Sequence, residues 1–267
     1  MTSDSRPEVL DNSIFWVKYA LSQNIFKPEE KDRKSIVEAI ETKLVSLENP
    51  FLFELKQKEA SSYKKDIKDE ETSRKVSLED LGSFAVENGA IGLIVSLTCG
   101  FDSLSVFKKE WKCPLILDCP IIDVAQLGLG DGVIISSGLS IKLGLDLGEF
   151  IDEAHSYGQE VILEVCSKEE FKLSKNTEAD IILVRVAGDK SNSIQDSITI
   201  LGSDTTSRPV LAYCTSLSSI TPALSAGARG IIIGDLVEQL QTHGITEFIK
   251  ILETLKKARV EKHAKRI

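Results

Sequence analysis

Apolar residues in the first part of the chain recur at the three- and four-residue spacing of an amphipathic helix. Two sets of residues follow this spacing: Ile14, Val17 and Leu21, and then Ile36, Ile40 and Leu44. The pattern predicts helices between residues 13 and 48. After this stretch the rhythm changes, and short apolar runs alternate with amphipathic segments. Such alternation is typical of βαβ units and a parallel sheet.

The second part of the chain contains eight strand candidates. They are Phe51–Lys56, Ile91–Leu97, Pro114–Leu117, Gly132–Ser136, Glu160–Val165, Asp180–Val186, Pro209–Tyr213 and Gly230–Gly234. Several are continuous apolar runs, such as Ile91–Val95, and strands that are buried on both faces have this composition. Eight units of this kind predict a single α/β domain, a (β/α)₈ TIM-type barrel. A doubly wound open sheet is the alternative fold.

The segments between the strands carry readable helix boundaries. Ser77 is placed to cap a helix, and Ser167 with Glu170 predicts a capping box. Three glycines, each just before a strand, are expected to end helices: Gly89, Gly158 and Gly227.

Two connections between strands are irregular. Residues 123–130, after the third strand, are too few and too rich in glycine for a full crossover helix, and residues 98–111 are also compact. We therefore expect N-terminal capping helices within residues 1–48, a barrel over residues 49–255 with a shortened crossover after its third strand, and a basic helix end at residues 256–267.

Length and charge narrow the class of protein. The chain has 267 residues, which suits one barrel of this type. Its net charge of -9 argues against a nucleic-acid partner. No apolar run reaches the roughly 20 residues that span a bilayer, so we expect no membrane association.

The N-terminus and the cysteines bear on the compartment. Residues 1–12 are acidic and lack the apolar core of a signal peptide. The five cysteines are an odd number without paired spacing, which indicates reduced thiols. We expect the protein to be located in the cytoplasm, or in a reducing organelle lumen such as the plastid stroma after removal of a transit peptide.

Several motifs occur in one consistent order between residues 30 and 240. They are Glu54-Leu55-Lys56 at the end of the first strand, Cys113 to Asp123 around the third, Ile162 to Val165 followed by Glu169-Glu170, and Ala226-Gly227-Ala228 through Gly234. Together they resemble indole-3-glycerol-phosphate synthase.

The resemblance implies a barrel of the ribulose-phosphate-binding kind and a lyase of tryptophan biosynthesis. That family closes an indole ring on a phosphorylated anilino-deoxyribulose, with loss of CO₂ and water. The reaction needs a general acid, a base and a phosphate cradle at the carboxyl ends of the strands. It implies a phosphorylated small molecule as ligand and no cofactor.

Only part of the family's active site is retained. Glu54, Lys56 and Glu164 match catalytic positions, whereas the general-acid lysine of the third strand is replaced by Asp118 and the asparagine of the sixth strand by Arg185. An ion pair that merely fills the barrel is the alternative interpretation of Glu54 and Lys56. Glu164 needs a partner, for which Lys56 is the nearest candidate in the sequence. Arg185 could instead neutralise Asp118 or Glu164.

The phosphate site is also reduced in the sequence. The family's Ser-Pro-Ser-Lys-Gly loop corresponds to residues 59–63, where only Ser61 matches, and its strand-seven Glu-Ser-Gly corresponds to residues 213–215. Gly234 is retained, and Thr215 and Ser216 could supply hydroxyl groups. These residues predict a weakened phosphate site.

Four cysteines fall at the carboxyl ends of predicted strands: Cys99, Cys119, Cys166 and Cys214. Strand alternation would turn Cys166 inward beside Glu164, and a reactive thiol or a soft-metal site would then be conceivable. There is no Cys-x-x-Cys spacing, however, and the three histidines, at positions 155, 243 and 263, fall on predicted helices. We therefore expect no metal site.

Two functional hypotheses follow. The first is a non-catalytic relative of the synthase that acts as a binding or assembly scaffold with a protein partner. The second is an active carbon–carbon lyase, or another barrel enzyme that acts on a phosphorylated sugar. The replaced residues favour the first hypothesis, and the retained Glu54, Lys56 and Glu164 favour the second.

Overall fold

The fold is a closed eight-stranded parallel barrel. The computed structural model describes residues 5–23, 25–27, 32–56, 77–97, 102–185, 200, 207–234 and 245–264. The strands follow one another around the barrel in chain order, and β8 pairs with β1 to close it. The closed sheet confirms the predicted (β/α)₈ barrel and excludes the doubly wound open sheet.

The strands lie where the apolar runs predicted them. Their bounds are β1 Phe51–Lys56, β2 Gly92–Ser96, β3 Leu115–Asp118, β4 Gly132–Ser136, β5 Glu160–Val165, β6 Ile181–Val184, β7 Val210–Cys214 and β8 Gly230–Ile233. Three predicted strands match the structure at both ends, and the others differ by one or two residues. Such small differences are expected, because apolar residues continue beyond the last ladder hydrogen bond.

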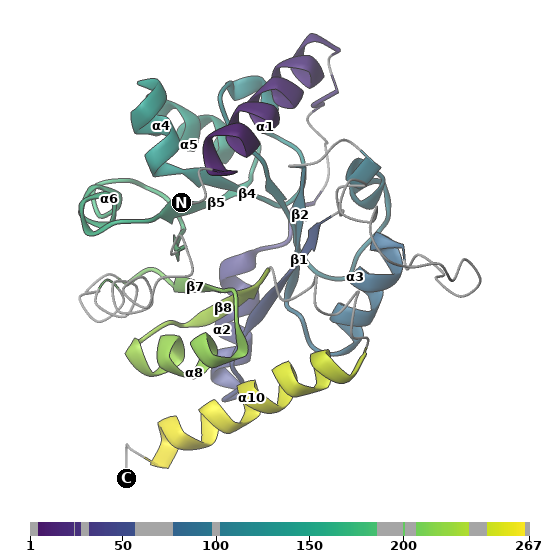
Figure 1. Ribbon diagram of the computed structural model, residues 1–267, viewed down its shortest axis with the longest axis vertical. Helices are drawn as coiled ribbons and strands as arrows, with labels where there is room; N and C mark the ends of the chain where they lie inside the picture. The colour runs from purple at the N-terminus through teal and green to yellow at the C-terminus, as the bar shows by residue number, and fades with distance from the viewer. Residues whose placement is uncertain are drawn as a thin grey trace.

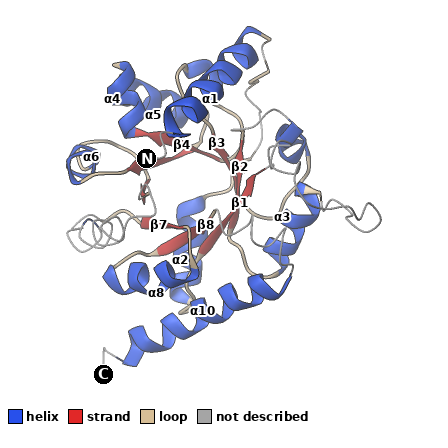
Figure 2. Cartoon of the chain, viewed as in Figure 1, coloured by secondary structure: helices blue, strands red, loops and turns tan. Residues whose placement is uncertain are grey.

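Helices surround the barrel on its outer side, except for α2, which lies across one end of it (Figures 1 and 2). Their bounds are α1 Ser5–Ser22, α2 Ile36–Val45, α3 Leu78–Glu87, α4 Ser137–Leu143, α5 Leu147–Ser156, α6 Lys168–Ser174, α8 Leu217–Ala226 and α10 Ile245–Ala264. The first helix begins earlier than residue 13, where the apolar spacing placed it. Among the described residues, no helix is long and apolar enough to cross a membrane.

Side chains of the strands alternate between two cores, as the two-residue period of a strand requires. Every strand contributes to an inner cluster, which includes Leu52, Ile94, Ile116, Ile134, Ile162, Leu183, Leu211 and Ile232. Their neighbours in sequence, such as Phe53 and Val95, face the helices and belong to a larger outer cluster. The barrel interior is therefore a packed core and not a pore.

Helix boundaries agree with most of the sequence signals. The Ser77 hydroxyl accepts a hydrogen bond from the Asp80 N–H, and the three predicted glycines end helices with positive φ. The capping box at Ser167 is only half formed. Ser167 accepts from the Glu170 N–H, but the Glu170 carboxylate instead accepts from the Cys166 N–H and the Ser137 hydroxyl.

The connection after β3 is short, as predicted. It contains only the 3-10 turn η3 Val124–Gln126, which a capping box between Asp123 and Gln126 begins. The backbone that follows this turn is not stabilised by a crossover helix. It is hydrogen-bonded by side chains from other parts of the chain. Arg33 donates to the carbonyls of Gly128 and Gly130, and Gln159 accepts from the Gly128 N–H at 2.6 Å. The second irregular connection contains another 3-10 helix, η2 Asp102–Lys108.

Helix α2 closes the floor of the barrel, the end where the strands begin. Ile36 and Ile40 are fully buried in the inner cluster. A Cβ on Gly132, the first residue of β4, would collide with the Ile36 side chain, so glycine permits this close approach.

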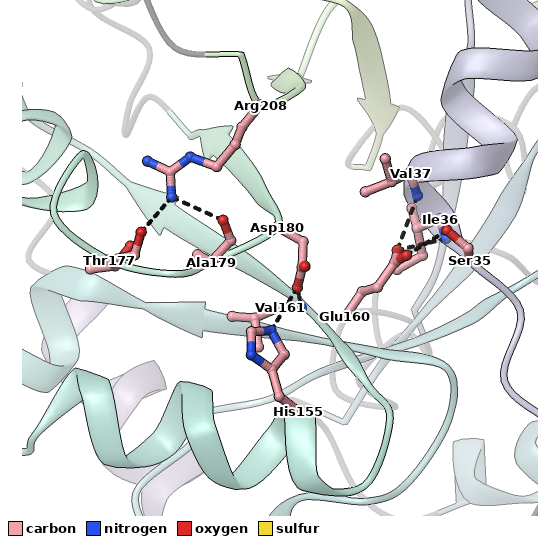
Figure 3. A network of polar contacts seen from close by, with 10 residues as sticks. All are labelled: Ser35, Ile36, Val37, His155, Glu160, Val161, Thr177, Ala179, Asp180 and Arg208. Carbon is pink, nitrogen blue, oxygen red and sulfur yellow. Dashed lines mark hydrogen bonds and ion pairs between the residues drawn. The ribbon is translucent and has the colours of Figure 1, made fainter.

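The first residue of β5 fastens α2 to the strands. Both carboxylate oxygens of Glu160 are used: one accepts from the Ser35 hydroxyl at 2.5 Å, and the other accepts from the Ile36 and Val37 N–H groups at 2.7 and 3.0 Å (Figure 3). Glu160 thus satisfies donors at the N-terminus of α2 that a helix cannot satisfy internally.

Candidate functional site

A ring of mostly polar residues lies directly above the inner cluster, at the carboxyl ends of the strands. Each inner-cluster residue named above is followed two positions later by a residue that faces the same way. The eight residues reached in this way are Glu54, Ser96, Asp118, Ser136, Glu164, Arg185, Tyr213 and Gly234. We call this ring the mouth. The alternation therefore brings together four of the predicted catalytic residues, and Lys56 lies two residues further along β1.

Arg185 connects two acidic residues across the mouth. Its Nε lies 2.7 Å from Glu164 Oε2, and its Nη2 lies 3.4 Å from Asp118 Oδ2. The Nε–H is nevertheless buried without a hydrogen bond, so the contact with Glu164 is an ion pair of poor angular geometry. An ion pair of Arg185 with these acids was one of the sequence-based expectations. The expectation that Lys56 is the nearest partner of Glu164 is wrong, because Arg185 takes that place.

Tyr213 extends this network to the first strand. Its hydroxyl donates a 2.6 Å hydrogen bond to Glu54 Oε2, and the Arg185 guanidinium lies over its ring at 4.2 Å from the centroid. A cation stacked on an aromatic face is held by both charge and dispersion. Five strands thus contribute to one network, which runs from Glu54 through Tyr213 and Arg185 to Asp118 and Glu164.

Burial changes the acidity of the mouth residues. Glu54 is 3% exposed, and this burial, assisted by the negative charge of Asp118, raises the pKa of Glu54 to about 7. Arg185, the Tyr213 hydroxyl and Lys56 oppose the rise. Burial also raises the pKa of Glu164 above its ordinary value, although Arg185 counteracts it. A carboxyl group with a pKa near 7 can exchange a proton at neutral pH.

Arg185 stays charged within this network. Burial works against the charged guanidinium, but the Asp118 and Glu164 carboxylates outweigh it and raise the pKa of Arg185 above its ordinary value. Arg185 therefore acts as a fixed positive charge and not as a proton donor.

Gly234, one of the predicted phosphate ligands, lies against Tyr213. A Cβ at this position would overlap the Tyr213 phenol and would lie 2.5 Å from Glu54 Oε2. Gly234 is buried, and its lack of a side chain makes room for the tyrosine. The inner side of Gly234 is therefore occupied by protein.

The remaining phosphate candidates are spread over the end of β7 and a region outside the described residues. Thr215 is exposed, and Ser216 precedes α8 with its hydroxyl 3.0 Å from that of Ser218. Ser61 lies outside the described residues. The structure brings Gly234 into contact with the mouth network, and Thr215 and Ser216 follow the last residue of β7.

The cysteines do not form a reactive cluster in the described part of the chain. Burial raises the pKa of Cys214 to about 11 and that of Cys119 far above its ordinary value, so both remain protonated thiols. The expectation that Cys166 points inward is wrong, because this residue, which follows the last residue of β5, is exposed. Cys99 lies outside the described residues.

His155 lies apart from the mouth, on α5, where its ring pairs with Asp180 at 2.9 Å (Figure 3). His263 falls within α10. His243 lies outside the described residues. Within the part of the chain that the structure describes, no group of three or more His, Cys, Asp or Glu side chains is arranged to hold a metal ion.

Three members of the mouth were missed by the sequence reasoning as site residues. Tyr213 was noted only as a departure from the family pattern, and Ser96 and Ser136 were not considered. A simple signal was available, since each lies two residues after an inward-facing apolar residue of its strand.

Comparison with known proteins establishes the fold. No protein family and no curated protein matches the sequence, so the resemblance to the synthase has no support at the family level. Among solved structures, the chain is similar to N-acetylmannosamine-6-phosphate 2-epimerase from Clostridium perfringens. That likeness has a TM-score of 0.57 and 12% identity, over 83% of this chain and 100% of the other.

A second solved structure gives the same result. Thiamine phosphate pyrophosphorylase from Pyrococcus furiosus is similar with a TM-score of 0.51 and 16% identity, over 82% of this chain and 98% of the other. At such low identity the likeness shows a shared (β/α)₈ barrel fold and nothing beyond it. It does not carry the chemistry of either protein to this one.

Proposed function

We propose that this protein is a non-catalytic relative of indole-3-glycerol-phosphate synthase and that its barrel serves as a binding or assembly scaffold. The observation that carries the proposal is the ion-paired position of Arg185, between Asp118 and Glu164. The mouth balances its own charges, so its acids are engaged with a protein cation.

The chemistry of the synthase supports the same conclusion. The resemblance places a general-acid lysine at the position of Asp118, and a carboxylate there reverses the charge. Arg185 is the cation that lies nearest to this carboxylate among the contacts described, and a guanidinium does not donate its proton at neutral pH. The loss of general acid catalysis alone is worth about 10²–10⁴ in rate.

A second candidate function rests on Glu54. Its pKa of about 7 suits a general acid or base, and Lys56 on the same strand carries a charge close enough to affect that pKa. The two similar solved structures are named for work on phosphorylated compounds. An enzyme that moves a proton on a phosphorylated sugar would use these two residues, and this is the alternative to the scaffold.

The two candidates are separated by a direct assay of the purified full chain. We expect no formation of indole-3-glycerol phosphate, and no rescue of a bacterial strain that lacks the synthase. Turnover that disappears in Glu164→Gln or Lys56→Ala would overturn the scaffold proposal. An authentic synthase, assayed in parallel, shows that the substrate and the conditions are competent.

Restoring the missing lysine provides a second test. Asp118→Lys places an ammonium where the family has its acid, but Arg185 and Tyr213 still occupy the mouth. We therefore expect this single variant to remain inactive, with less than about a hundredth of the turnover of an authentic synthase. Robust turnover by Asp118→Lys would mean that the rest of the active site is intact.

A further inference from the structure

We infer that the mouth binds a small neutral polyhydroxylated molecule, such as an unphosphorylated sugar, in preference to a phosphorylated one. This inference rests on the proposed function of a barrel that binds without synthase turnover, and it names the class of ligand. Three features of the mouth carry it: the balance of charge, the unused hydrogen-bonding capacity of Arg185, and the position of Tyr213.

The charges of the mouth nearly cancel. Among the described residues, Arg185 contacts Asp118 and Glu164, and the charge of Lys56 acts on Glu54. With Asp118 and Glu164 ionised the sum is zero, and ionisation of Glu54 makes it negative. A phosphate group that carries about two negative charges would gain no net attraction from this site. A neutral ligand is not repelled by any part of it.

Arg185 has hydrogen-bonding capacity that the described residues do not use. A guanidinium carries five N–H donors. Within the described residues, its side chain makes one hydrogen bond, to Asp118, and that bond is long at 3.4 Å. The Nε–H, although close to Glu164, is not aimed at an acceptor. A ligand oxygen that accepts from the guanidinium would therefore gain a contact that the described residues do not supply.

The acids beside Arg185 select the kind of ligand. A carboxylate accepts hydrogen bonds and cannot donate them. A sugar hydroxyl can donate to Asp118 or Glu164 while it accepts from Arg185, whereas a phosphate oxygen can only accept at these positions. The alternation of donors and acceptors in the mouth thus matches a molecule with several hydroxyl groups.

The Tyr213 side chain occupies the space through which a phosphate group in the mouth would reach Gly234. Its phenol fills the space next to Gly234, and the Glu54 carboxyl group lies beside it. An anion there would meet an aromatic ring and an acid. Solvent nevertheless reaches the mouth, because 27% of the Arg185 side chain and about half that fraction of Asp118 and Glu164 are exposed.

The test is a calorimetric titration of the purified full chain with matched probes. The neutral probes are ribose, xylose, glucose and myo-inositol, and the anionic probes are ribose 5-phosphate, glucose 6-phosphate and inorganic phosphate. We expect at least one neutral probe to bind, and its phosphate to bind about tenfold more weakly or worse. Tighter binding of a phosphorylated probe, or no heat from any neutral probe at millimolar concentration, would overturn the inference.

Substitutions of mouth residues test whether the neutral probe binds at the mouth. Arg185→Lys removes the fork of donors but keeps the charge, and we expect it to weaken binding of the neutral probe at least about tenfold. Asp118→Asn, with nearly the same shape, should weaken binding as well, and it serves if Arg185→Lys fails to fold. Arg229→Lys is the matched control, because Arg229 pairs with Glu41 away from the mouth. Unchanged binding in both mouth variants would contradict the inference.

The inference about the ligand class and the proposed function are tested by different experiments. Phosphate binding without synthase turnover would overturn the ligand class alone, whereas turnover of the synthase substrate would overturn the scaffold.

Discussion

The two ends of the barrel both contain networks of charged residues, but the networks have different partners. At the floor, carboxylates bind backbone N–H groups: Glu160 accepts from Ile36 and Val37, and Asp180 accepts from Val161 at 2.7 Å (Figure 3). At the mouth, the three acids are contacted within the described chain by side chains only, chiefly those of Arg185 and Tyr213.

The difference in partners indicates a difference in role. Removing such a carboxylate leaves a backbone N–H without its acceptor, so a carboxylate of this kind stabilises the fold. A network made only of side chains could be replaced by apolar residues, often without loss of stability. The charged side chains of the mouth therefore fit a role in binding better than a role in folding. The predictions below test this contrast.

We expect the largest effect from removing the central cation of the mouth. Arg185→Met leaves Asp118 and Glu164 without their counter-ion, and loss of one partner of a buried ion pair costs about 4 kcal/mol. Denaturant unfolding measures this change. Arg229→Met, at a surface ion pair, is the control and should cost less than about 1 kcal/mol. Equal losses in the two variants would remove the argument that Arg185 neutralises a buried cluster.

The titration of Glu54 should give the mouth a characteristic pH dependence. Its pKa in the folded protein, about 7, lies above the ordinary value of 4.5, so the folded state binds this proton more tightly than the unfolded chain does. The contribution of Glu54 to stability is therefore present below pH 4.5 and is lost as pH rises to 7. The expected loss is about 3 kcal/mol.

Glu54→Gln isolates this contribution, because glutamine does not titrate. We expect the stability of the variant relative to the natural protein to increase between pH 4.5 and 7 and to stay constant above that. Glu253→Gln, on an exposed part of α10, is the matched control for the loss of a carboxylate. A constant difference for Glu54→Gln across this range would show that Glu54 is ionised as in water.

At the floor, Glu160→Ala should destabilise the protein by about 2 to 3 kcal/mol. The substitution leaves two N–H groups at the start of α2 and the Ser35 hydroxyl without their acceptor. In this variant, hydrogen exchange of the Ile36 and Val37 amides should be faster than in the natural protein. Protection of these amides in the variant would mean that the carboxylate does not fasten α2 to the strands.

A smaller loss is expected where the backbone approaches Tyr213 most closely. Gly234→Ala introduces a methyl group that overlaps the phenol, and we expect a cost of about 2 kcal/mol. Tyr213→Leu should relieve most of this cost when the two substitutions are combined. A double-mutant cycle measures the coupling, and additive effects would show that the two residues are not in contact.

Much of the fold could be predicted from the sequence, because strands that are buried on both faces appear in it as continuous runs of apolar residues. The inward direction of Glu54 and Glu164 followed from strand alternation. The same alternation gave the wrong direction for Cys166, which is exposed just after the end of β5. The half-formed capping box at Ser167 could not be foreseen. The Glu170 carboxylate accepts hydrogen bonds from the Cys166 N–H and the Ser137 hydroxyl, and Ser137 comes near Glu170 only in the folded chain.

The partners within the mouth were harder to predict. The pairing of Glu164 with Arg185 instead of Lys56 depends on which strands are adjacent, and β5 and β6 are neighbours while β1 lies across the barrel. Tyr213 was read as a lost family residue. Its contact with Gly234 and Glu54 depends on the closure of the sheet between β8 and β1, which no local pattern records.

The contrast between the two ends is tested most directly by replacing Arg185 and both of its acidic partners at once. The triple variant Asp118→Leu, Glu164→Met, Arg185→Met removes these three charges together, so that none of them is left without its ion-pair partner. We predict a free energy of unfolding equal to that of the natural protein or higher, by up to about 4 kcal/mol. A loss of several kcal/mol would contradict the account, since it would make the mouth network, like the floor, a requirement of folding.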